Sequence, residues 1–129
     1  MLHHLSFGVS DLDRSSRFYD AVLGALGYVR VWSAPDAVGY GISGGGDRFA
    51  IKRRAGGGRA PGPGFHLAFA APSPGAVDLA YGLGLQHGGL NDGPPGPRPH
   101  YGPHYYAGFL IDPDGYHVDM VINSPCAGD

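Results

Sequence analysis

The chain has 129 residues, which suits one domain with a full hydrophobic core. Its formal net charge of −2 gives no reason to expect a nucleic acid or a membrane surface as partner. No apolar run reaches the ~20 residues that a bilayer span needs, and we expect no signal peptide because the N-terminus lacks a basic region followed by an apolar one.

Cysteine and glycine usage give two further expectations. The only cysteine, Cys126, cannot form a disulfide within the chain, which favours a cytoplasmic protein. The 24 glycines and 12 prolines gather in residues 39–64 and 82–103, while periodic apolar patterns fill the rest. We therefore expect an ordered domain with long glycine-rich loops rather than a disordered chain.

The first element in the chain is a strand. Apolar residues alternate with small or polar ones along residues 3–9, the pattern of a strand with one core face. Leu5, Phe7 and Val9 form the core face. His4 lies on the other face, which has the small and polar residues expected of a cavity lining.

A helix and three strands follow. Ser10 or Asp11 can cap the helix, and Gly27 suits its C-terminal stop. An apolar stripe at helical spacing runs between these ends: Leu12, Phe18, Tyr19, Val22, Leu23 and Leu26. The runs "YVRVWS", "AVGYGIS" and "RFAIKRR" then predict strands, so the first half of the chain is β-α-β-β-β.

The second half repeats the first at an offset of 62 residues. His4 and Leu5 in "HLSF" correspond to His66 and Leu67 in "HLAF". Further pairs follow in the same order through the helix and its stop: Tyr19 with Tyr81, Leu23 with Leu85 and Gly27 with Gly89. This order predicts a duplicated module.

The second module is expected to contain a strand at 65–71, a helix at about 73–87 and a hairpin. The runs "YYAGFLI" and "YHVDMVI" flank "DPDG", whose residues suit a type I turn. The remaining strand should lie in or near the long loop "HGGLNDGPPGPRPHYGPH". We expect one domain over 1–129, with module 1 at about 1–60 and module 2 at about 64–124.

Two histidines and one carboxylate suggest a metal site. On the last strand, His117, Asp119 and Val121 share the face opposite the apolar one. If the sheet closes on itself, Asp119 points to the same side as the two duplicated histidines. Two imidazoles and a carboxylate form a facial site with open positions for substrate oxygens. Alternatively, each histidine is an ordinary strand residue.

The sequence resembles the vicinal oxygen chelate superfamily of glyoxalase I, bleomycin- and fosfomycin-resistance proteins and extradiol dioxygenases. The resemblance covers almost the whole chain and rests on "HHLSFGVSDLDRSSRFYDAVLGALGY", "GFHLAFAAPSPGAV" and "YYAGFLIDPDGYHVDMV". It implies an α+β fold of two tandem βαβββ modules that form a curved mixed sheet around a central cavity. It also implies a homodimer and a divalent metal ion, which could be Fe, Mn, Zn, Ni or Co.

The resemblance assigns the family's metal ligands to His4, His66 and Asp119. Asp119 replaces the usual glutamate and is one methylene shorter. Glyoxalase I-like relatives add a fourth carboxylate on the strand "RFAIK", where Phe49 and Ile51 are the expected inward residues. Neither can bind a metal or take a proton, so the ligand set is more similar to that of an extradiol dioxygenase.

Other residues are candidates for catalysis or for substrate binding. Tyr105, Tyr106 and His117 are the catalytic candidates, since extradiol enzymes keep His and Tyr near the metal. The residues expected to contact substrate are Arg98, His100, Tyr101 and Phe49. Arg98 could clamp an anion or bond to nearby loop carbonyls, and the tyrosines could line a pocket or pack within the sheet.

Two functions follow from this set. The first is a mononuclear divalent-metal enzyme acting on a small molecule with vicinal oxygens, either a glyoxalase-like lyase or isomerase or an extradiol-type dioxygenase. The second is a metal-free protein that binds and sequesters a drug or metabolite, of the bleomycin-resistance type. The sequence leaves open whether the site lies within one chain or between two.

Overall fold

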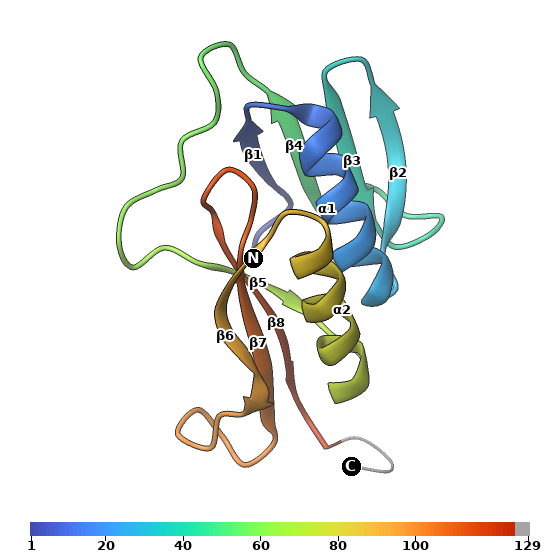
Figure 1. Ribbon diagram of the computed structural model, residues 1–129. Coiled ribbons are helices and arrows are strands. Elements are labelled where there is room, and N and C mark those ends of the chain that lie inside the picture. Colours follow the sequence, from blue (N-terminus) through green and yellow to red (C-terminus); the bar gives the residue numbers. More distant parts are fainter. Residues whose placement is uncertain (126–129) are drawn as a thin grey trace.

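The computed structural model describes residues 1–125, so Cys126 lies outside the described residues. The chain forms two βαβββ modules in tandem, as predicted (Figure 1). Module 1 contains β1 (Leu5–Val9), α1 (Leu12–Ala25), β2 (Val29–Ala34), β3 (Ala37–Gly41) and β4 (Phe49–Arg53). Module 2 contains β5 (Leu67–Ala70), α2 (Pro74–Gln86), β6 (Leu90–Pro97), β7 (Tyr105–Ile111) and β8 (His117–Asn123).

Each module builds its own four-stranded mixed sheet. The strand orders are β1-β4-β3-β2 and β5-β8-β7-β6, so the duplication extends to topology. β1 runs parallel to β4 and β5 runs parallel to β8, while the other neighbours are antiparallel. The two sheets are not hydrogen-bonded to each other within the described chain, which leaves β1 and β5 each with a free edge.

The helices begin and end close to where the sequence predicts. The Asp11 carboxylate caps α1 by accepting from the Arg14 amide at 3.1 Å, and Ser73 caps α2 by accepting from Ala76 at 3.1 Å. The chain leaves α1 through Gly27, whose φ of 96° suits glycine. No helix in residues 1–125 is long and apolar enough to cross a membrane.

The strand predicted in or near the long loop is β6. Its sequence, "LNDGPPGP", has little β propensity, but β6 lies at the edge of its sheet, where proline is tolerated. Its pairing with β7 shifts register near Gly93 and again before Gly96. These irregularities explain why periodicity does not reveal β6.

One hydrophobic core joins the two modules. The helices α1 and α2 pack against each other, and a Cβ at Gly84 would lie 2.4 Å from Leu110 Cδ1 and 3.1 Å from Val22 Cγ2. The absence of a side chain at Gly84 therefore lets α2 approach both α1 and β7. Tyr19, which is fully buried, makes ring contacts with Phe7, Phe18, Tyr40, Phe49 and Phe69.

The hairpin turn of module 2 docks on the start of α1. The Tyr19 hydroxyl donates to Asp112 Oδ2 at 2.5 Å, and Asp112 Oδ1 accepts from the amides of Asp114 and Tyr116 at 2.9 Å. Asp114 accepts from the Ser10 amide at 3.1 Å and from its hydroxyl at 2.6 Å. Burial and the Asp112 charge raise the pKa of Tyr19 well above its usual value, so Tyr19 remains a donor.

The Tyr19→Phe substitution tests this contact between modules. It leaves the buried Asp112 carboxylate without its side-chain donor, so we expect the free energy of unfolding to fall by about 2 kcal/mol. Urea denaturation measures the change. Tyr81→Phe is the control, because it removes an exposed hydrogen bond to Asn91 and should cost about 0.5 kcal/mol or less. Equal losses in the two variants would contradict the assigned role of Tyr19.

Candidate functional site

A cavity of about 770 Å³ lies between the sheet of module 2 and the linker that joins the modules. We call it the module-2 cavity. The linker contributes Pro61 to Phe65, and the sheet and its loops contribute polar and aromatic side chains: His66, Asp92, Tyr101, Tyr105, Phe109, His117 and Asp119. Five of these seven are residues that the sequence predicts for the site.

His66 and Asp119 meet on one wall of this cavity. Ala68 is the register partner of Asp119 on β8, and His66, two residues before Ala68, lies on the same face. His66 Nε2 and Asp119 Oδ2 are 3.7 Å apart. The Asp119 residue is 8% exposed, whereas the His66 side chain is 62% exposed, so a nearly buried carboxylate faces an accessible imidazole.

Burial also changes the chemistry of Asp119. It raises the pKa of the carboxyl group from 3.8 to about 6, and the nearby Asp92 charge acts in the same direction. His66, His117 and Arg98 oppose the shift. The surroundings of Asp119 thus disfavour its charge, so a cation placed beside the carboxylate would be stabilising.

A second histidine–carboxylate pair lies in the same cavity. His117 Nδ1 and Asp92 Oδ2 are 2.7 Å apart. The sequence predicts His117 as a site residue but not Asp92, which lies on the irregular edge strand β6. No pattern in the glycine- and proline-rich loop distinguishes Asp92 from a solvated acid.

Aromatic rings line the part of the cavity near Arg98. Tyr101 contacts both His100 and Tyr105 in tilted arrangements, with ring centroids 4.1 Å and 5.1 Å away. The Arg98 guanidinium lies 4.8 Å from the centroid of Phe109 and donates to carbonyls of its own loop, at Pro94 and Gly96. Of the two interpretations of Arg98, the structure therefore shows the local one: the guanidinium bonds to loop carbonyls and lies over Phe109, which lines the cavity.

Tyr106 and Phe49 lie away from this cavity, whereas Arg98 and His100 contact its lining residues Phe109 and Tyr101 without being part of the lining. Tyr106 points to the opposite face of β7 from Tyr105, packs against the core and donates to Asp78 of α2 at 2.6 Å. That hydrogen bond raises the pKa of Tyr106 to about 12. Phe49 is 4% exposed, is the register partner of Leu5 on the core side of the sheet, and lines a second, smaller cavity instead of this one.

Because Phe49 faces the core, a fourth metal ligand on β4 would have to come from the opposite face of that strand. On β4, Ala50 and Lys52 face away from the core, as partners of Ser6 and Gly8. Neither is a carboxylate, so β4 offers no fourth acidic ligand. On this face the Trp32 side chain of β2 covers Gly39, its register partner on β3. A Cβ added at Gly39 would lie 2.2 Å from the indole nitrogen.

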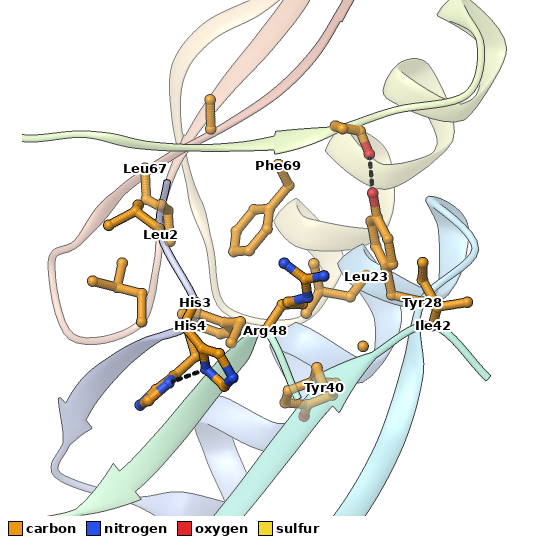
Figure 2. A pocket seen from close by; sticks show the side chains of 15 residues that line it. Leu2, His3, His4, Leu23, Tyr28, Tyr40, Ile42, Arg48, Leu67 and Phe69 are labelled. Atoms are coloured by element: carbon orange, nitrogen blue, oxygen red, sulfur yellow. Dashed lines mark hydrogen bonds between the residues drawn. The ribbon is translucent and has the colours of Figure 1, made fainter. Parts of the chain in front are cut away.

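His4 lies in a different cavity, which Figure 2 shows from close by. This junction cavity has a volume of about 330 Å³ and lies where the N-terminal segment and the ends of β3 and β4 meet β5. His4 Nδ1 is 2.9 Å from His3 Nδ1. Within residues 1–125, no group of three His, Cys, Asp or Glu side chains is arranged to hold a metal. A single chain therefore brings together two of the three predicted ligands.

Two βαβββ modules with a histidine–carboxylate pair on the open face of the second define the vicinal oxygen chelate class of proteins. A family model supports this: "Glyoxalase/Bleomycin resistance protein/Dioxygenase superfamily" matches residues 1–120, and the chain belongs to that superfamily. No curated protein matches the chain significantly.

Solved structures agree with this assignment. A glyoxalase/bleomycin resistance protein from Albidiferax ferrireducens is 33% identical with a TM-score of 0.78, over 94% of this chain and 97% of that one. A putative glyoxalase from Bacillus halodurans is 28% identical with a TM-score of 0.67, over 94% of both chains. A glyoxalase-related enzyme from Fulvimarina pelagi shares the fold. It is 23% identical with a TM-score of 0.73, over 95% of this chain and 88% of that one.

The raised pKa of Asp119 predicts a pH-dependent stability. In the folded chain the pKa is about 6, above the ordinary 3.8, so the folded state holds the proton more tightly. The stability that this group contributes is therefore greatest at low pH and falls as the pH rises from about 4 to 6. In metal-free protein at pH 7, Asp119→Asn should raise the free energy of unfolding by about 2 kcal/mol.

Denaturation in the presence of a chelator, repeated across this pH range, measures the difference between Asp119→Asn and the unmodified chain. At pH 4 the gain should nearly vanish, because Asp119 is then mostly protonated. Asp92→Asn is the comparison: Asp92 is more exposed and only a secondary cause of the Asp119 pKa shift, so its gain should be smaller. A gain that stays constant with pH would show that Asp119 ionises normally.

Proposed function

We propose that the protein is a mononuclear divalent-metal enzyme that acts on a small molecule with vicinal oxygens. The metal would be held by His66 and Asp119 of one chain and by His4 of a second copy. The observation that supports this most directly is the His66–Asp119 pair, 3.7 Å apart on the wall of the module-2 cavity. An imidazole nitrogen and a carboxylate oxygen suit Fe, Mn, Zn, Ni or Co.

The case for a second copy rests on the free strand edges. Within residues 1–125, β1 and β5 each have no neighbouring strand on one side, and unpaired edges favour pairing with another chain. His4 immediately precedes β1, and His66 immediately precedes β5. A homodimer with β1 of one copy beside β5 of the other would bring the exposed His4 towards His66 and Asp119, in two equivalent sites related by a two-fold axis.

The cavity side chains have separate tasks in this proposal. A bound metal would supply Lewis acidity to the substrate oxygens. Asp92 would accept the Nδ1 proton of His117, which leaves Nε2 free to take a proton from the substrate. Tyr101, Tyr105 and Phe109 would pack against the substrate and exclude water. Since β4 has no acid on its open face, His117 is the base that this cavity offers.

Both reaction types remain within the proposal: an extradiol-type dioxygenase, and a glyoxalase-like lyase or isomerase. The three-ligand set without an acid on β4 favours the first. The similarity to a glyoxalase/bleomycin resistance protein supports the family but not a reaction. We place the protein in the cytoplasm because its one cysteine gives no disulfide framework.

A metal-free binding protein is the second candidate function. One observation favours it: in a single chain, both cavity histidines already face a carboxylate, His66 with Asp119 and His117 with Asp92. The adjacent, tilted rings of Tyr101 and Tyr105 would then contact an aromatic drug or metabolite. Metal content distinguishes this function from the first.

Protein purified without a histidine tag should contain about one divalent ion per chain. Asp119→Ala and His66→Ala should each lose the ion, because each substitution removes a ligand. Elemental analysis and metal titration measure the content. Asp92→Ala is the matched control on the same cavity wall and should keep the ion. A chain that takes up no metal on titration would be the metal-free binding protein.

A mixing experiment tests whether two copies share the site. His4→Ala and Asp119→Ala chains should each bind little metal when they are alone. Exchange of subunits in an equal mixture should restore about one quarter of the unmodified content, because half of the dimers are mixed and each has one intact site. Mixing His66→Ala with Asp119→Ala is the control and should restore none, since both ligands come from the same chain. No recovery in the first mixture would rule out a shared site.

A further inference from the structure

The linker between the modules runs from the end of β4 to the start of β5 and concentrates positive charge (Figure 1). Residues 48–66 contain no aspartate or glutamate and hold five of the nine lysines and arginines of the chain: Arg48, Lys52, Arg53, Arg54 and Arg59. We propose that Arg59 binds a carboxylate of the substrate, so that the substrate is a small carboxylic acid with vicinal oxygens. This inference rests on the proposed function, which places the vicinal oxygens at the metal.

Close packing of Gly58 on β1 fixes the linker just before Arg59. A Cβ at Gly58 would overlap the Gly8 carbonyl oxygen, so a side chain there would displace the linker. The same oxygen accepts from the Tyr116 hydroxyl at 2.8 Å, which joins the linker, β1 and the β7–β8 hairpin at one point. Gly8 lies near the end of β1, whereas the proposed dimer needs the start of that strand, beside His4.

A second contact fixes the linker just after Arg59. The Ala60 side chain packs against the core, and its Cβ lies 3.8 Å from the position of a Cβ at Gly115, in the turn before β8. Pro61, the next residue, lines the module-2 cavity, and so does His117 at the start of β8. Arg59 is therefore held between two anchors, at the end of the cavity where His117 lies.

The Arg59 guanidinium is available to a ligand. The residue is exposed, and its side chain makes no hydrogen bond or ion pair with another residue in the described part of the chain. A free guanidinium offers the two parallel donors that a carboxylate accepts. The Arg54 side chain comes within 3.4 Å of the position of a Cβ at Gly8 and adds a second positive charge near this rim. The two charges together would attract an anion to the cavity.

Charges inside the cavity do not oppose an anion at this end. Each of its two carboxylates faces an imidazole, Asp119 with His66 at 3.7 Å and Asp92 with His117 at 2.7 Å. A divalent ion at Asp119 would add positive charge. Asp119 and His117 are two residues apart on β8, about 7 Å along the strand, and the rim lies beyond His117. A molecule with one aromatic ring between its vicinal oxygens and its carboxylate suits this arrangement.

Two diols of matched shape are the probes: 3,4-dihydroxybenzoate and its neutral amide, 3,4-dihydroxybenzamide. Calorimetry measures their affinities for the zinc-loaded protein, since zinc does not oxidise the diols. The unmodified protein should bind the acid about tenfold more tightly than the amide, the difference expected for one charge-assisted contact. In Arg59→Gln the preference for the acid should disappear.

Two further variants separate the charge of the linker from its position. Arg17→Gln removes an exposed arginine of α1 outside the linker and the cavity, so the preference should be unchanged. Gly58→Ala keeps every charge but displaces the linker, so the preference should fall although Arg59 is present. Thermal denaturation verifies that each variant is folded.

Removal of zinc by a chelator distinguishes this inference from the proposed function. Both probes should then bind more weakly, while Arg59→Gln should still weaken the acid more than the amide. Affinities that do not change on chelation would contradict the metal site and leave the role of Arg59 standing.

Three results would overturn the role of Arg59. The first is the absence of a preference for the acid in the unmodified protein, including a failure to bind the acid at all. The second is an unchanged preference in Arg59→Gln. The third is an unchanged preference in Gly58→Ala, which would show that the anchored position of Arg59 does not matter.

Discussion

The Tyr19 hydroxyl donates to the Asp112 carboxylate inside the shared core, and this contact sets where the hairpin of module 2 lies relative to module 1. Asp112 also holds the amides of Asp114 and Tyr116, so the same carboxylate shapes the turn. β8 starts directly after that turn, at His117, and alternation along it then directs Asp119 towards the module-2 cavity. The candidate site therefore depends on a hydrogen bond on the other side of the sheet.

Much of this architecture could be predicted from the sequence, because strong signals carry it. The repeated His-Leu-x-Phe stretches indicate the duplication, and "DPDG" between two apolar runs marks the hairpin. β6 could not be predicted in the same way, since an edge strand of glycine and proline has no periodic pattern. Asp92 and its pairing with His117 could not be seen for the same reason.

Where the predicted site residues lie depends on strand faces, which the sequence does not reveal. On β4, Phe49, Ala50 and Ile51 are all apolar, so the sequence does not tell which face is the core; pairing with β1 decides it. Tyr105 and Tyr106 are adjacent and must point in opposite directions, but only the fold shows that Tyr106 faces α2. His4 and His66 occupy equivalent positions in the repeat, yet only module 2 supplies a carboxylate beside its histidine.

The single tryptophan lies on the open face of module 1. The Trp32 indole covers Gly39 at a position where any side chain would displace it, and the residue is 37% exposed. Since Trp32 is the only tryptophan among the 129 residues, the near-ultraviolet emission of the protein has one dominant source. A second copy or a ligand that covers this face would change that fluorescence. Assembly can therefore be followed by the intrinsic fluorescence of Trp32, without an added label.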